Sequence, residues 1–187
     1  MYKPLTGRNK MITKAVRMYG KNDLRLEEFT LPEIDKDEIL VKVISDSICM
    51  STYKESQQGS AHKRIPQGID KHPVIVGHET AGDIIKVGAD WQGKYKAGDK
   101  FSLQPALIYE GKSHTVGYSY ETCGGACTYA VMPAEVMYTD SLLDYKGDAY
   151  YEASLSEPMS CIIGAFHASY HTIPGTYKHE MGIKKDG

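Results

Sequence analysis

Short runs of apolar and β-branched residues, separated by turn residues, occupy most of this chain, and this pattern limits the possible folds more than any other feature. The runs lie at residues 13–18, 24–29, 39–44, 74–76, 83–87, 101–103 and 127–132. Glycines at positions 20, 88, 93 and 98 lie between runs, as expected for turns between strands. Strands this short with turns this frequent predict an all-β barrel or sandwich. The polar, basic residues 53–72 are interpreted as a long loop.

The pattern changes at Ser156, where apolar residues begin to recur at helical spacing. The recurring residues are Met159, Ile162, Ile163, Phe166 and Tyr170. Ser156 is the predicted N-cap and Pro158 is compatible with a first helical turn. Glu157 would then lie at the helix N-terminus, where the macrodipole favours a carboxylate. We therefore expect one domain over residues 1–155, and a helix with a hinge over residues 156–187.

Charge and composition exclude several classes of protein. The net charge of −2 and the pI near 6.4 argue against a nucleic acid or an anionic membrane as partner. No apolar run approaches the ~20 residues that a membrane-spanning helix needs, and the N-terminus has no apolar signal segment. Four cysteines in 187 residues are too few for a disulfide scaffold. These observations predict a cytoplasmic protein with reduced thiols.

Three separate segments carry residues that could bind a metal ion. Cys49 offers a thiolate, His78 an imidazole, and Glu79 and Glu157 offer carboxylates. Structural zinc sites use four protein ligands at short local spacings, whereas catalytic sites use scattered ligands and leave one position open. Because the gaps between these residues are long, only a folded domain could bring them together. The sequence therefore predicts a catalytic zinc site with Cys49, His78, Glu79 and Glu157 as ligands.

Two of these assignments leave alternatives open. Glu79 could coordinate the ion directly, exchange with water, or orient the other ligands by hydrogen bonds. Glu157 competes with Cys161, because residues four apart on a helix share a face. The position at the helix end favours Glu157, and Cys161 is then a packing residue.

The order of motifs resembles the medium-chain zinc alcohol and polyol dehydrogenases. The resemblance covers roughly residues 13–170 and is most similar to the sorbitol dehydrogenase and L-sorbose 1-phosphate reductase types. The matching motifs are Cys49 with Ser51, Gly77-His78-Glu79, Val87-Gly88, residues 96–100, Gly124-Gly125 with Tyr129, and Glu157-Pro158-Met159-Ser160.

This resemblance implies a GroES-like β-barrel catalytic domain, mainly β with some α, whose C-terminal helix leads toward a Rossmann domain. No Gly-x-Gly-x-x-Gly follows a strand in this sequence, so we expect the chain alone to be incomplete and inactive. The implied cofactors are Zn²⁺ and NAD or NADP, the nucleotide being bound mainly by the domain outside this sequence. The implied substrate is a small polyol, sugar or sugar phosphate, and the implied full-length assembly is a homo-oligomer.

The resemblance also implies roles for two residues after Cys49. Ser51 occupies the place of a hydroxyl that passes the alcohol proton toward solvent, although an ordinary loop serine is the alternative. Lys54 occupies a place where many relatives carry histidine. It could pass protons if its pKa were lowered, hold an anionic group of the substrate, or be a solvated surface charge. Together with the basic residues 62–64, it hints at a phosphorylated sugar.

Cys123 and Cys127 are not expected to bind a second, structural zinc ion. The family's structural zinc lobe uses four clustered cysteines, but residues 103–122 contain none, so that zinc is expected to be absent. Cys123 and Cys127 are expected on or beside a strand without metal. A zinc-free reductase of the quinone-reductase sort and a non-catalytic barrel used for binding or oligomerisation are the alternative functions.

Overall fold

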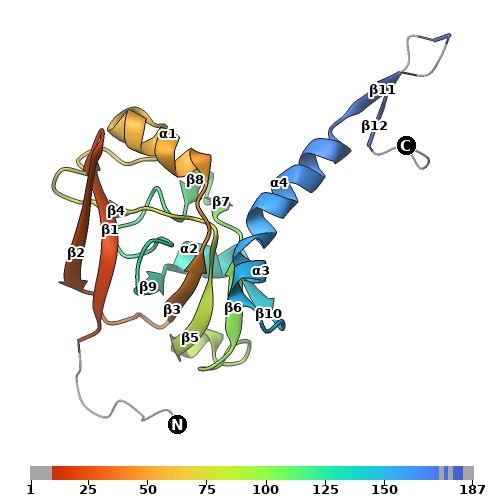
Figure 1. Ribbon diagram of the computed structural model, residues 1–187. Helices are drawn as coiled ribbons and strands as arrows, with labels where there is room; N and C mark the ends of the chain where they lie inside the picture. Colours follow the sequence, from red (N-terminus) through yellow and green to blue (C-terminus); the bar gives the residue numbers. More distant parts are fainter. Residues whose placement is uncertain (1–9, 173–174, 177–178, 183–187) are drawn as a thin grey trace.

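The computed structural model describes residues 10–172, 175–176 and 179–182, and its elements are mainly short strands (Figure 1). The strands are β1 (Ile12–Gly20), β2 (Asp23–Thr30), β3 (Ile39–Asp46), β4 (Val74–Ile75), β5 (Thr80–Val87), β6 (Lys100–Leu103), β7 (Ala106–Tyr109), β8 (Lys112–Thr115), β9 (Tyr129–Met132), β10 (Leu142–Tyr145), β11 (Tyr170–Thr172) and β12 (His179–Met181). The helices are α1 (Met50–Gln58), η1 (Gly59–Ala61), η2 (Ala89–Trp91), α2 (Ala134–Tyr138), α3 (Tyr150–Ser154) and α4 (Ser156–His167). Each run predicted as a strand overlaps an observed strand.

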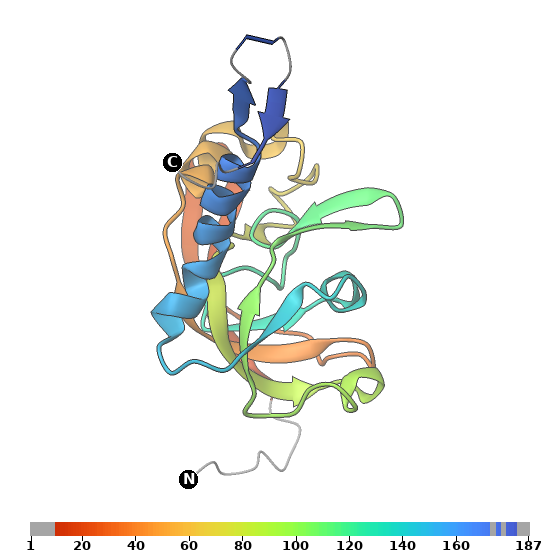
Figure 2. The same ribbon diagram turned by 90° about the vertical axis from the view of Figure 1, so that its right-hand side faces the viewer.

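Two antiparallel sheets form the body of the protein. One has the strand order β10-β6-β5-β3-β9 and the other the order β2-β1-β4. A bridge between Ala15 and Cys127 joins β1 to the segment before β9, and Val16 N donates to Ala126 O at 2.8 Å. The β7–β8 and β11–β12 hairpins are separate two-stranded units. Figure 2 shows β7–β8 extending away from the five-stranded sheet.

The first part of strand β3, Ile39 to Val41, is buried on both of its faces. Ile39 and Val41 belong to the largest apolar cluster, together with Phe101 and other side chains of the five-stranded sheet. Leu40 points to the opposite side and packs with Val131. Since alternate strand residues face opposite sides, a continuous apolar run is needed where both sides are covered. This explains why the run lacks apolar-polar alternation at residues 39–41.

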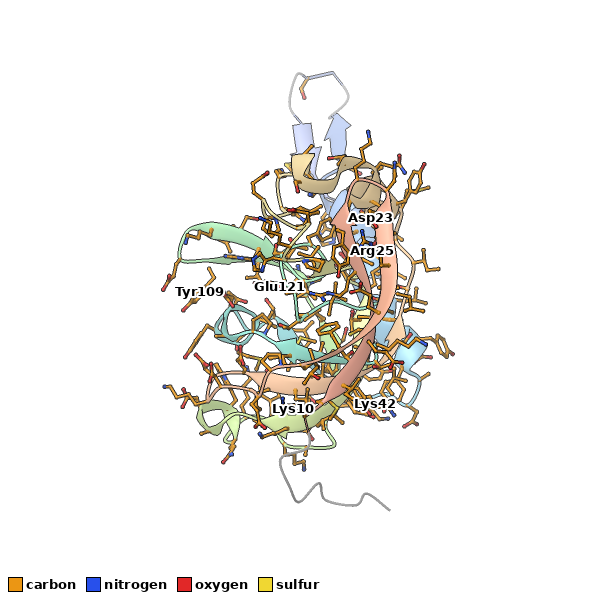
Figure 3. All side chains as sticks on the ribbon, turned by 90° about the vertical axis from the view of Figure 1, so that its left-hand side faces the viewer. Lys10, Asp23, Arg25, Lys42, Tyr109 and Glu121 are labelled. Atoms are coloured by element: carbon orange, nitrogen blue, oxygen red, sulfur yellow. The ribbon has the colours of Figure 1, made fainter. Side chains whose placement is uncertain are left out.

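The β1–β2 hairpin positions helix α1. Asn22, in the hairpin turn with φ 58°, donates from its backbone N to Ser56 O at 2.7 Å. Gln57 Nε2 donates to Asn22 Oδ1 at 2.6 Å. Figure 3 shows Asp23 and Arg25 at this end of the hairpin and Lys10 at the other. The tip of one hairpin therefore fixes the helix that begins just after Cys49.

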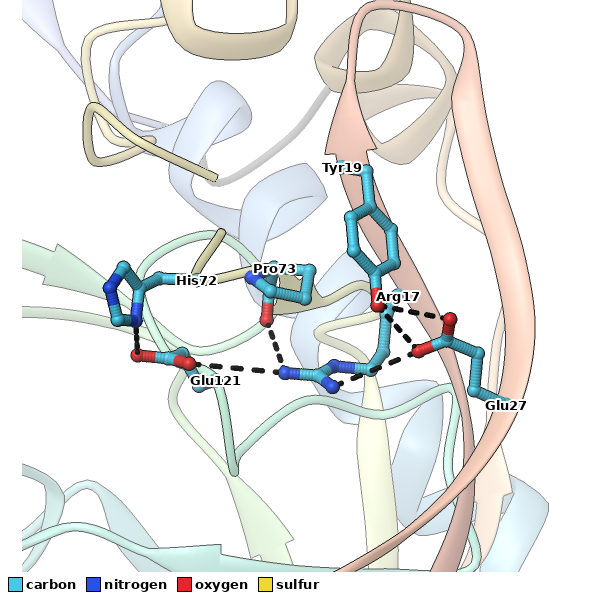
Figure 4. Close-up of polar contacts among 6 residues, drawn as sticks. All are labelled: Arg17, Tyr19, Glu27, His72, Pro73 and Glu121. Atoms are coloured by element: carbon cyan, nitrogen blue, oxygen red, sulfur yellow. Dashed lines mark hydrogen bonds and ion pairs between the residues drawn. The ribbon is translucent and has the colours of Figure 1, made fainter. Parts of the chain in front are cut away.

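A polar network fastens the segment before β4 (Figure 4). Arg17 Nη2 donates to Pro73 O at 3.1 Å. The same guanidinium lies 3.7 Å from Glu27 and 3.9 Å from Glu121. Glu121 in turn contacts His72 Nδ1 at 3.2 Å. Because β4 leads directly into the turn that carries His78, this network helps to place the candidate site.

Helices α1 and η1 contradict the first part of the predicted long loop over residues 53–72, whereas residues 62–72 form the expected loop. The Cys49 side chain caps α1 by accepting from Ser51 N at 3.4 Å. Of its nine residues only Glu55 and Ser56 are buried, so the helix has no apolar stripe of the kind that reveals a helix in sequence. Hydrogen bonds to Asn22 in the β1–β2 turn and the Cys49 cap stabilise it instead.

The prediction of Ser156 as N-cap was also wrong. The N-cap of α4 is Leu155, which has αR dihedral angles and directly follows α3. Ser156 Oγ instead donates to Ala153 O at 2.7 Å. The helix ends at His167, and Tyr170, predicted within it, begins β11. Figure 1 shows α4 leading away from the sheets toward the β11–β12 hairpin, and none of the described helices is long and apolar enough to cross a membrane.

Candidate metal centre

The turn between β4 and β5 places His78 and Glu79 in the protein interior. It begins at Gly77, whose φ of +90° lies in the left-handed region that favours glycine. A Cβ at Gly77 would overlap the carboxylate of Asp46 and lie 2.6 Å from Ala126 N. His78 and Glu79 are 6% and 3% exposed. The glycine therefore permits a tight turn that buries two polar side chains.

Gly77→Ala is expected to destabilise the protein by about 3 kcal/mol or more, because it combines unfavourable dihedral angles with backbone overlap. Gly93→Ala is the matched control, since a Cβ there meets nothing within 4 Å. Urea unfolding of both variants measures the difference. A Gly77→Ala variant as stable as the Gly93→Ala variant would contradict the role assigned to this turn.

Asp46 and Ser47, at the end of β3, orient Glu79. Asp46 Oδ1 accepts hydrogen bonds from Glu79 N and from Thr80 Oγ1, both at 3.0 Å. Ser47 Oγ donates to Glu79 Oε2. Burial, opposed by these two hydrogen bonds, raises the pKa of Asp46 to about 6. Asp46 thus holds the backbone of Glu79, and Ser47 holds its carboxylate.

The three candidate ligands Cys49, His78 and Glu79 come together and form what we call the Cys49–His78–Glu79 cluster. One possible ligand atom from each residue lies within 4.8 Å of the other two. Among the described residues, these three form the group of His, Cys, Asp or Glu side chains close enough together to hold a metal ion. The buried Nδ1 of His78 has no hydrogen-bond partner in the described structure. Burial, with a smaller contribution from the charge of Arg64, lowers the pKa of His78, although Glu157 and Glu79 oppose this. Neutral imidazole is the form that binds a metal ion.

Sulfur, nitrogen and oxygen donors in this arrangement fit Zn²⁺, a borderline-soft cation bound by Cys, His and carboxylate. The buried imidazole nitrogen without a partner is the particular feature that an ion would satisfy, because unpaired buried polar groups are costly. The residues present are therefore compatible with the metal that the sequence predicted.

Glu157 and Cys161 lie on α4, outside the Cys49–His78–Glu79 cluster. Cys161 Sγ lies 3.6 Å from Glu157 Oε1. The charge of Glu157 affects the pKa of His78. The pKa of Cys161 is raised mainly by burial, then by Glu157, with a smaller contribution from Cys49. Coordination by Glu157 rather than Cys161 stays a prediction.

The predicted proton-transfer residues occupy different environments on α1. Ser51 is half-buried and Lys54 is exposed. Burial, and then the charge of Glu55, raises the pKa of Tyr118 to about 12, while a hydrogen bond with Ser51 opposes the rise. Ser51 therefore contacts the hydroxyl of Tyr118, whose ring lies next to that of His78. The roles of Ser51 and Lys54 stay predictions.

Sequence reasoning missed several residues around the site. The ring of Tyr118 lies 5.4 Å from that of His78 and 5.1 Å from that of His62. Glu55 is fully buried, and neither carboxylate oxygen has a partner in the described structure. Asp46 is the third such residue. None has a motif of its own, and a buried acid within a polar helix is visible only after folding.

Comparison with known proteins shows which family this chain resembles. The profile of the alcohol dehydrogenase GroES-like domain matches residues 35–140. The chain is 47% identical to an L-sorbose 1-phosphate reductase from Klebsiella pneumoniae, covering 94% of this chain and 43% of that protein. It is 53% identical to a mannitol-1-phosphate 5-dehydrogenase from Aliivibrio fischeri, covering 94% of this chain and 41% of that protein.

Among solved structures, 2R,3R-butanediol dehydrogenase from Bacillus subtilis superposes with a TM-score of 0.67 at 24% identity. The match covers 83% of this chain and 46% of that one. This likeness concerns the fold. The chain thus spans less than half the length of these curated relatives and of this structural neighbour.

Proposed function

Because this chain belongs to the alcohol dehydrogenase GroES-like domain family of the medium-chain zinc alcohol dehydrogenases, we propose that it is the zinc-binding catalytic part of an NAD(P)-dependent oxidoreductase. The proposed reaction interconverts a polyol or sugar alcohol and the corresponding ketose or aldehyde. Phosphate esters are included among the substrates, because two relatives are named for a ketose phosphate and a polyol phosphate.

The observation that carries this proposal is the convergence of Cys49, His78 and Glu79 within 4.8 Å. These residues would hold Zn²⁺, and Glu157 of α4 is proposed as a further ligand. When bound, zinc supplies Lewis acidity that favours the alkoxide of an alcohol or polarises a carbonyl, so that hydride can pass to or from nicotinamide. In the proposed scheme, Ser51 relays the alcohol proton toward solvent by accepting it while giving up its own hydroxyl proton, because a hydroxyl both donates and accepts hydrogen bonds.

We also propose the organisation of the larger protein. Residues 1–155 form the catalytic domain, and residues 156–187 lead to a domain that binds NAD or NADP. The full-length protein is proposed to be a cytoplasmic homo-oligomer. The length of the relatives supports this scheme, since this chain accounts for 43% and 41% of two of them.

Metal analysis of the purified chain tests the proposal. We expect about one equivalent of zinc per chain, removable by a chelator and restored by added zinc, as for a site with deprotonated ligands. Less than half an equivalent, unchanged by Cys49→Ala, would count decisively against it. A barrel that binds no zinc would favour the alternative of a non-catalytic binding or oligomerisation module.

A further inference from the structure

The loop between η1 and β4 holds Arg64 in a fixed position. Arg64 N donates to His62 Nδ1 at 3.3 Å, and Arg64 O accepts from Ser119 Oγ at 2.9 Å. The next residue, Ile65, is 5% exposed and packs in the apolar cluster that contains Tyr118. The backbone on both sides of the guanidinium is therefore anchored, unlike that of an ordinary solvated loop.

A row of three rings connects this loop to the Cys49–His78–Glu79 cluster. His62, whose Nδ1 accepts from Arg64, lies 5.1 Å from Tyr118 between ring centroids. Tyr118 lies 5.4 Å from His78. The ring of Tyr118 thus lies between the anchored loop and His78, the candidate metal ligand.

The charge of Arg64 is not balanced by an acidic partner. The side chain is half-buried, and among the described residues it forms no ion pair with a carboxylate. Burial, and then the positive charge of Arg64, lowers the pKa of His62, the first ring of the row.

An unpaired cation beside a metal site opposes binding of the metal cation, so an anion is the group that this position would favour. The anionic ligands proposed for Zn²⁺ are the Cys49 thiolate and the carboxylates of Glu79 and Glu157, and together they would offset or exceed its charge. A substrate dianion would therefore gain attraction from Arg64 rather than from the metal and its ligands. A guanidinium is suited to this task because its planar donors match phosphate oxygens in pairs.

We propose that Arg64 binds the phosphate group of the substrate and that the site selects phosphate monoesters of polyols or ketoses over the free sugars. This inference rests on the proposed function and specifies its substrate class. Lys63, next to Arg64, is exposed and is not part of the proposed contact. It therefore provides a control with the same change of charge.

The test measures how tightly the zinc-loaded chain binds two matched probes, D-sorbitol 6-phosphate and D-sorbitol. Binding is followed by the change of NMR chemical shifts as each probe is added. We expect the phosphate ester to bind about 10- to 100-fold more tightly, the range that hydrogen bonds to a charged group supply. Arg64→Gln should remove this preference without changing the affinity for D-sorbitol. Arg64→Lys should keep part of it, and Lys63→Gln should keep nearly all of it. Inorganic phosphate should compete with the ester in the wild-type chain and not in Arg64→Gln.

Equal affinities for the two probes in the wild type would overturn this inference, and so would an unchanged preference in Arg64→Gln. An equal loss in Lys63→Gln would mean diffuse attraction by the loop and would overturn it too, as would binding of neither probe. Failure of the chain to take up zinc is a different result, because it would remove the proposed function itself. Circular dichroism of each variant checks that the fold is retained.

Discussion

His78→Ala is expected to weaken zinc binding by more than about 100-fold, since loss of groups that merely support a ligand already costs about 10- to 100-fold. Cys49→Ser should have a similar effect, because a serine hydroxyl is a much poorer zinc ligand than a thiolate. In the full-length enzyme both variants should abolish turnover. Competition with a chromogenic chelator measures the zinc affinity. Comparison of the circular dichroism spectrum with that of the wild type shows whether the barrel still folds.

Each of these variants has a control of the same residue type. His167→Ala removes an exposed imidazole at the end of α4, and it should leave zinc affinity unchanged. Cys161→Ser removes the exposed thiol on α4. If Cys161→Ser lost zinc as completely as Cys49→Ser, Cys161 would replace Glu157 as the proposed ligand. Near-normal turnover of the full-length His78→Ala or Cys49→Ser enzyme would refute the roles assigned to the cluster.

Cobalt(II) gives a second readout of the same site. A cysteine thiolate bound to cobalt should produce sulfur-to-metal charge-transfer absorption, which an oxygen ligand from serine does not supply. We expect this absorption in the wild type and in Cys161→Ser, and its loss in Cys49→Ser. The pattern would distinguish loss of a ligand from a general weakening of the fold.

Glu55→Gln is expected to stabilise the protein, which is unusual for a change in the interior. Burial raises the pKa of Glu55 to about 9, so the folded state keeps this carboxyl protonated while the unfolded state ionises near its ordinary value. Between these two pKa values the folded state binds more protons than the unfolded state, and stability therefore falls as pH rises. At pH 7.5 the stability lost by keeping Glu55 protonated reaches up to about 4 kcal/mol, at 1.36 kcal/mol per pH unit. Glutamine, a neutral amide of similar shape, avoids this loss.

Urea unfolding at a series of pH values measures this effect as the difference between the variant and the wild type. The gain in Glu55→Gln should be small near pH 5 and should grow toward pH 8. Glu28→Gln, at an exposed position of β2, should change stability by no more than about 0.5 kcal/mol at any pH. A Glu55→Gln variant that is less stable than the wild type, or whose difference does not depend on pH, would show that the buried carboxyl is not protonated as argued.

The strands and the metal-binding residue types could be predicted from the sequence because they depend on local patterns. The alternation in β1 and the apolar run that starts β3 report on neighbours in the chain. The motifs around Cys49 and His78 carried the family resemblance, which the profile match over residues 35–140 confirmed. Helix α1 escaped this reasoning, since it has no apolar stripe and is placed by the tip of the β1–β2 hairpin.

The sequence by itself determined a mainly β chain with a thiol, an imidazole and carboxylates suited to zinc. Only the tertiary structure decided which of these meet, and it brought Glu79 rather than Glu157 into the group with Cys49 and His78. It also placed Asp46 against Glu79, buried Glu55, and set Arg64 beside the row of rings that leads to His78. The physical reason is that secondary-structure patterns arise from residues a few positions apart, whereas a binding site arises from strand register, tight turns and side-chain burial between segments far apart in the chain.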